Sequence, residues 1–104
     1  MNWKSKKNQR LVEAVVAITS ESEARRFLRD VMTEKEIKEF ANRLRAAEML
    51  MEKASYTIIE KETGLSSTTV ARVAKWLNGK EGGYRIILGK LHHRKTIQLR
   101  RGSS

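Results

Sequence analysis

Apolar residues recur along most of this chain at the spacing of one face of an α-helix. The runs predict helices at about residues 5–18, 21–31, 34–52 and 67–77, and a short helix between Ser55 and Gly64. A last helix is predicted at residues 84–91, although Gly89 weakens its pattern and YRIIL at residues 84–88 also suits a short strand. Five or six helices without a clear strand predict an all-α fold.

Short polar side chains precede several of these runs and predict where helices begin. The four candidate N-caps are Ser20, Thr33, Ser55 and Ser66. Glu23 and Glu36 follow the first two of them by three residues, which is the spacing of a capping box. Gly64 is expected to end the short helix, because glycine adopts the left-handed backbone of a helix C-terminus at little steric cost.

The apolar residues form more stripes than one small helical monomer is expected to cover. These stripes follow residues 11–18, 24–31 and 37–51, the last one through Ile37, Phe40, Ala41, Leu44, Ala47 and Met51. The same long helix carries Met49 and Leu50 away from that main face. Uncovered apolar faces are typical of protein–protein interfaces. We therefore expect a second copy of the chain to cover them in a homodimer.

The segment ETGLSSTTVARVAKWL at residues 62–77 interrupts two helical runs at a glycine and opens the second run with four small hydroxyl residues. A short helix, a tight turn with glycine and a second helix form a helix-turn-helix, whose second helix enters the major groove of DNA. Ile59, Leu65, Val70 and Val73 are spaced to pack the two helices together. The sequence predicts this motif at about residues 55–77.

Small side chains at the start of the second helix allow it to approach the edges of bases. Ser67, Thr68 and Thr69 follow the cap Ser66, and we expect all four residues at the DNA interface, where hydroxyls donate or accept hydrogen bonds. Arg72 and Lys75 come later on the helix and are expected to reach phosphates or a guanine. The alternative is that these serines and threonines are ordinary caps and that Gly64 is an ordinary helix stop.

The charge of the chain favours a polyanionic partner. The net charge is +10, with +4 on residues 1–10 and +5 on residues 89–104, and residues 63–80 contain bases but no acid. We expect double-stranded DNA as the partner, a single helical domain over residues 1–91 and a basic, flexible tail over residues 92–104 that ends in RGSS. A basic RNA-binding protein and a helical protein-interaction adaptor are the alternatives.

The composition and the motifs argue against several other classes of protein. The chain has no cysteine, which excludes disulfides and cysteine-ligated metals. It lacks both an apolar run of membrane-span length and the apolar core of a signal peptide, so we expect a cytoplasmic, nucleoid-associated protein and no membrane partner. His92 and His93 are adjacent and point in different directions on a helix, which makes them a poor chelating pair, so we predict no metal site. No nucleophile, base and orienting residue form a set, so no enzyme is predicted.

Three stretches together resemble the Trp repressor family, and most closely the YerC/YecD branch of Trp-repressor-like proteins. These stretches are MTEKEIKEFANRLRAAEML, SYTIIEKETGLSSTTVARV and WLNGKEGGY. The resemblance implies an intertwined, all-helical homodimer with one helix-turn-helix in each subunit. It also implies a sequence-specific transcriptional regulator that acts as a repressor. By position it also implies that Ser67, Thr68, Thr69, Ala71 and Arg72 face DNA.

The same resemblance bears on a small-molecule effector. The founding member of the family holds a tryptophan corepressor between two arginines, and the positions around that pocket match Thr33, Arg43, Thr69 and Arg72. Val73 and Trp76 stand where that repressor has a glycine and a serine. Because both side chains are bulkier, we expect them to fill the space of the ligand, and we predict no cofactor and no tryptophan corepressor. Arg43 and Arg72 are instead expected to hold the helix by stacking on Trp76.

Overall fold

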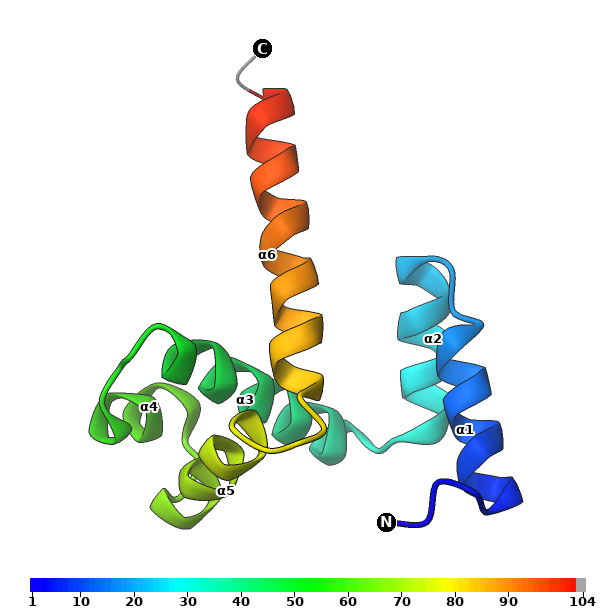
Figure 1. The fold of residues 1–104 in the computed structure, drawn as a ribbon, viewed down its shortest axis with the longest axis horizontal. Coiled ribbons are helices and arrows are strands. Elements are labelled where there is room, and N and C mark those ends of the chain that lie inside the picture. The colour runs from blue at the N-terminus through cyan, green and yellow to red at the C-terminus, as the bar shows by residue number, and fades with distance from the viewer. Residues whose placement is uncertain (103–104) are drawn as a thin grey trace. The chain divides into compact units, whose positions relative to one another are not determined.

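Six helices make up the part of the chain that the computed structural model describes, which is the backbone of residues 1–102 and the side chains of residues 1–94 (Figure 1). They are α1 (Lys6–Val16), α2 (Glu21–Val31), α3 (Glu34–Met51), α4 (Tyr56–Thr63), α5 (Ser67–Leu77) and α6 (Gly83–Gly102). No strand occurs in these residues, which confirms the all-α fold. The segment YRIIL lies in α6 and therefore forms helix, not strand.

The chain divides into two compact units, residues 1–37 and residues 38–104. The first unit contains α1, α2 and the start of α3. Neither α1 nor α2 has a buried residue, and apolar side chains such as Leu11, Val15 and Val31 are at least half exposed. The apolar stripes predicted at residues 11–18 and 24–31 therefore exist as helix faces that this single chain leaves uncovered.

The second unit has a core that draws on all four of its helices. Its buried members are Ala46, Ala47, Met49, Ile59, Val70, Val73 and Leu88. The two alanines on α3 are fully buried, so the backbone of this helix lies close to its neighbours. Val70, Val73 and Leu77 of α5 point inward, as the periodicity predicts. Helix α5 therefore packs against this core through the side that carries Val70, Val73 and Leu77.

The predicted inward face of α3 is confirmed in part, because Ala47 is fully buried and Leu44 packs against the core. Met49 is only 3% exposed, whereas Phe40 and Met51, predicted on the main inward face, are 44% and 47% exposed. The helix carries apolar residues on two faces, and its short-range periodicity does not reveal which face the helix-turn-helix will cover. Phe40 and Met51, toward the two ends of the predicted face, are left partly uncovered in the single chain.

The predicted caps form, with one change of partner. Ser20, Ser55 and Ser66 each accept a hydrogen bond from the amide three residues later. Thr33 and Glu36 form the reciprocal capping box, in which the Thr33 amide and hydroxyl donate to the Glu36 carboxylate at 3.0 Å. Glu23 accepts from the amide and hydroxyl of Thr19 at 2.9 Å and not from the Ser20 amide. The capping box predicted between Ser20 and Glu23 is therefore wrong in the partner of Glu23.

These hydrogen bonds have an electrostatic consequence. Donation by Thr19 lowers the pKa of Glu23, and donation by Thr33 lowers the pKa of Glu36, because hydrogen bonds stabilise the ionised carboxylate. Both side chains therefore carry negative charge beside the positive ends of α2 and α3, where the helix dipole favours it.

The last helix is longer than the periodicity indicates. It continues to Gly102 and so occupies most of the segment that we expected as a basic tail over residues 92–104. Residues 90–101 contain neither proline nor glycine, so no helix breaker interrupts it. Residues 103–104, the end of RGSS, lie outside the described residues. The single domain over residues 1–91 stays a prediction.

Candidate nucleic-acid interface

Helices α4 and α5 are joined by a three-residue turn and form the predicted helix-turn-helix (Figure 1). Their contact is built on Ile59 of α4 and on Val70 and Val73 of α5, all of which are fully buried. Gly64 follows α4 with a φ of 75°, which is the left-handed conformation expected for it. The turn thus reverses the chain at the residue type that tolerates this backbone best.

Thr63, the last residue of α4, supports the turn and is not among the residues predicted from the sequence. It is 7% exposed, its hydroxyl donates to the Ile59 carbonyl at 2.7 Å and it accepts from the Leu65 amide at 3.2 Å. The side chain therefore connects the last turn of α4 to the first residue after Gly64. A threonine directly before a C-capping glycine was the available signal.

One side of α5 points away from the core, and we call it the outer stripe of α5. Its members are Ser67, Thr68, Ala71, Arg72 and Lys75, all of which are exposed. Their spacing places them on one continuous helical face, opposite Val70 and Val73. Among the described side chains, neither Arg72 nor Lys75 takes part in a hydrogen bond or ion pair, so both cations are available to a partner.

The two remaining predicted residues at the start of α5 have structural roles as well. Ser66 accepts from the Thr69 amide at 3.2 Å, and its hydroxyl donates to the Thr69 hydroxyl at 3.1 Å. Thr69 is half-buried, whereas Ser66 is exposed. The cap interpretation therefore holds for Ser66 and Thr69, and it leaves Ser67 and Thr68 with exposed hydroxyls beside the cap.

The electrostatic character of this surface is positive. No acidic residue occurs in α5, and the first-turn amides of a helix attract anions such as phosphate. Arg72 and Lys75 add two positive charges further along the outer stripe. The surface can accept hydrogen bonds from base edges through hydroxyls and can neutralise phosphates through its cations.

Arg43 of α3 contacts α5 through Trp76, which lies outside the outer stripe. Its guanidinium carbon lies 5.6 Å from the ring centre of Trp76 and 5.6 Å from that of Phe40, while Glu39 accepts a hydrogen bond from it at 3.0 Å. The predicted stacking of Arg43 on Trp76 is confirmed. Arg72, by contrast, makes no cation–π contact among the described residues.

Three of the four residues of the candidate effector pocket lie in the second unit and have different surroundings there, and the pocket itself stays a prediction. Arg43 and Thr69 belong to the second unit and are engaged with Trp76 and Ser66, respectively, whereas Arg72 is exposed on the outer stripe. Thr33 lies in the first unit, where its hydroxyl donates to Glu36. Arg43 Nε is buried without a hydrogen-bond partner, so this guanidinium retains one unused donor.

A groove of about 690 Å³ adjoins Trp76 in the second unit. Its apolar walls are Leu44, Trp76, Tyr84 and Ile87, with Gly79 and Gly83 between them and Lys75, Lys80 and Glu81 at the edge. Burial raises the pKa of Tyr84, opposed by the nearby charge of Arg43. The groove therefore presents an apolar surface next to the helix-turn-helix.

No metal cluster of three or more histidine, cysteine, aspartate or glutamate side chains occurs in the part of the chain that the structure describes. In the same residues, no helix combines the length and the apolar character needed to cross a membrane.

The fold and the outer stripe of α5 define an all-α protein with a helix-turn-helix. The profile of the Trp repressor protein family matches residues 6–92. The uncharacterized protein YerC of Bacillus subtilis is 33% identical over 93 residues, which cover 89% of this chain and 89% of YerC. The crystal structure of a TrpR-like protein from Eubacterium eligens has a TM-score of 0.79 and 33% identity, covering 86% of this chain and 93% of that chain.

The chain therefore belongs to the Trp repressor family, as its sequence motifs indicated. Members of this family are helix-turn-helix regulators of the DNA-binding class and not enzymes. The relatives extend over most of the chain, so the fold likeness covers both units and is not confined to the helix-turn-helix.

The turn yields a direct test of its packing. Thr63→Val keeps the shape of the side chain but removes the hydroxyl that serves both Ile59 and Leu65. We expect the free energy of unfolding to fall by about 1–3 kcal/mol, because the Leu65 amide loses its partner in a partly buried place. Urea titration followed by circular dichroism measures this, with Thr57→Val on the exposed side of α4 as the matched control. Equal stability of the two variants would contradict the role of Thr63.

Proposed function

We propose that this protein is a sequence-specific regulator of transcription, acting as a repressor, that binds double-stranded DNA through α5. The observation that carries the proposal is the outer stripe of α5, which is exposed, free of acids and populated by short hydroxyl side chains and two unpaired cations. Membership in the Trp repressor family supports the same class. A cytoplasmic, nucleoid-associated location follows from this function.

We infer further that the active form is an intertwined homodimer. In the first unit, Leu11, Val15 and Val31 are exposed on helices without a buried residue. In the second unit, Ile87 and Leu91 of α6 are exposed, and the groove beside Trp76 is apolar. Apolar faces on both units are what a second copy would remove from water. In a dimer, the two copies of α5 would lie about 34–36 Å apart, which is one turn of DNA.

Two measurements test the dimer: the mass of the protein in solution and the effect on that mass of a charge in place of Val15. Light scattering at micromolar concentration is expected to give twice the mass of the chain. Val15→Lys places a charge on the uncovered face of α1 and is expected to shift the mass toward the monomer. Gln9→Lys adds the same charge at an exposed polar position of α1 and serves as the control. A monomeric wild-type protein would contradict the proposal.

Base contacts and phosphate contacts on α5 are distinguished by two kinds of variant. We expect Thr68→Ala and Thr69→Ala to change sequence preference, because loss of a base contact costs about 1–3 kcal/mol of discrimination. Lys75→Ala is expected to weaken all duplexes alike and to lower the salt slope by about one unit. Fluorescence anisotropy with a duplex selected from a randomised library, and with random duplex, measures both effects.

Adding RNA as a competitor to the same anisotropy experiment separates the alternative functions. RNA that displaces the selected duplex at equal concentration would favour an RNA-binding protein whose basic ends carry the affinity. Absence of binding to either nucleic acid at moderate salt would favour a protein-interaction adaptor. Equal losses on selected and random duplex for both threonine variants would contradict the assignment of base contacts to α5.

We also propose that DNA binding needs no tryptophan corepressor. Val73 is fully buried in the core, and the Trp76 ring is occupied by contact with Arg43. Arg43 is itself engaged by Glu39 and Phe40, so the charge that would receive a ligand already has partners. An added indole ring would have to displace these side chains, and overfilling a packed site costs about 1–3 kcal/mol.

Calorimetric titration with tryptophan, together with DNA binding in its presence and absence, tests this proposal. We expect no saturable heat of binding and the same affinity for the selected duplex in both conditions. Saturable binding that markedly tightens the DNA complex would overturn the proposal, and it would mean that Val73 and Trp76 do not occupy the place of a ligand.

A further inference from the structure

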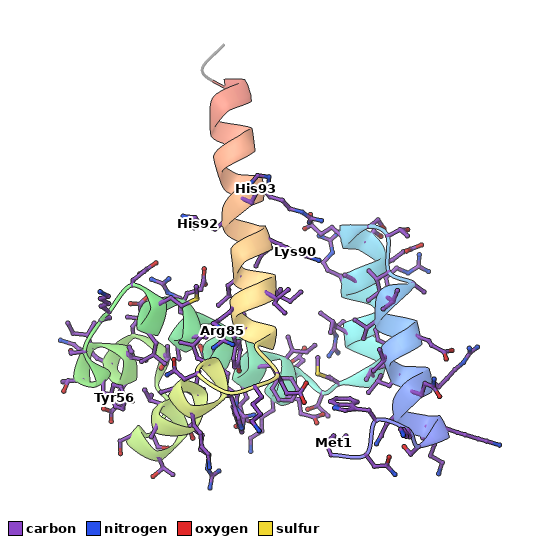
Figure 2. All side chains as sticks on the ribbon, in the orientation of Figure 1. Met1, Tyr56, Arg85, Lys90, His92 and His93 are labelled. Atoms are coloured by element: carbon purple, nitrogen blue, oxygen red, sulfur yellow. The ribbon has the colours of Figure 1, made fainter. Side chains whose placement is uncertain are left out.

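Arg85, in the first turn of α6, bonds to the backbone at the end of α5. Its Nη1 donates to the Leu77 carbonyl at 2.6 Å and its Nη2 donates to the Gly79 carbonyl at 3.2 Å. Figure 2 shows Arg85 at the lower end of α6, next to the turn that follows α5. One side chain therefore bridges the two helices through two backbone groups.

The Leu77 carbonyl is one of those that a helix end leaves without an intrahelical partner, and the Gly79 carbonyl lies two residues beyond the end of α5. The other groups at this end are bonded locally, with the Asn78 amide and side chain both donating to Ala74, and the Gly79 amide donating to Trp76. The guanidinium also places a positive charge at the negative end of the α5 dipole, where cations are stabilising. Its planar fork suits two acceptors at once, which a lysine ammonium does not reproduce.

The glycine before α6 leaves room for this arrangement. Gly82 has a φ of 65°, and a Cβ added there would lie 2.9 Å from Nη2 of Arg85. The chain thus has a residue without a side chain where the guanidinium approaches the turn. A side chain at residue 82 would meet the guanidinium and would also be strained by the left-handed backbone.

We propose that Arg85 is a positioning residue for DNA recognition, holding α5 at a set angle to α6. The inference rests on the proposed function. Ile86 and Ile87 follow Arg85 directly and are exposed, so the same turn of α6 carries apolar residues available to a second copy. Arg85 then connects the helix that meets the partner to the helix that meets DNA, and the outer stripe of α5 is presented in a fixed orientation.

Three variants separate this role from a loss of charge. Arg85→Gln removes the charge and the fork, Arg85→Lys keeps the charge alone, and Lys90→Gln removes one charge further along α6 (Figure 2). We expect Arg85→Gln to weaken the selected duplex about tenfold relative to Lys90→Gln, since it removes two charge-assisted hydrogen bonds. The affinity for random duplex should fall equally in Arg85→Gln and Lys90→Gln. The affinity of Arg85→Lys for the selected duplex is expected to lie between those of wild type and Arg85→Gln.

Hydrogen exchange in the protein without DNA gives a second readout. In Arg85→Gln, the amides at the end of α5 and in the following turn, residues 74–82, should exchange faster, while α4 and α3 keep their wild-type rates. A purely stabilising role predicts faster exchange in every helix of the second unit, together with unchanged preference for the selected duplex well below the melting temperature. That combination would overturn the inference.

The failure of the inference is distinguishable from the failure of the proposed function. If wild-type protein shows no preference for the selected duplex over random duplex, the proposed function fails and the role of Arg85 in recognition fails with it. If wild-type protein discriminates and Arg85→Gln discriminates equally well, the proposed function stands and the inference alone is overturned.

Discussion

The packing of α5 through two valines is the constraint on which the rest of this structure depends. Val70 and Val73 are fully buried against a core that includes Ile59, Ala46 and Ala47. A helix buried along one side has its orientation about its own axis determined, because rotation would expose the valines to water. The opposite side, the outer stripe of α5, is exposed as a direct consequence. Its lack of acids makes that side suited to a polyanion.

Both ends of α5 and one flank are held by further contacts of different chemistry. Ser66 caps its first turn, Arg85 bonds to the carbonyls at its end, and Arg43 stacks on Trp76 at its side. These contacts use neutral hydrogen bonds, charge-assisted hydrogen bonds and a cation–π interaction. The uncovered apolar faces of α1, α2 and α6 do not hold α5, and we propose that they form the interface between two copies of the chain.

Much of this arrangement could be predicted from the sequence, because it depends on residues close together in the chain. Helix caps, the left-handed Gly64 and the inward valines of α5 all follow from local spacing. The inward face of α3 could be predicted only in part: Ala47 packs inward as expected, but that helix has apolar residues on two faces and only tertiary packing buries Met49 while it leaves Met51 exposed. Nor could the bond from Arg85 to Leu77, which joins a side chain to a backbone group in another helix and leaves no periodic pattern.

The central claim is that α5, and not the basic ends of the chain, reads DNA. The most direct measurement is an NMR titration of amide-labelled protein with a duplex selected from a randomised library. The account predicts that the largest shift changes fall on residues 66–75, with smaller changes at the basic residues of the two ends. Changes confined to residues 1–10 and 89–104, with the amides of α5 unmoved, would contradict it.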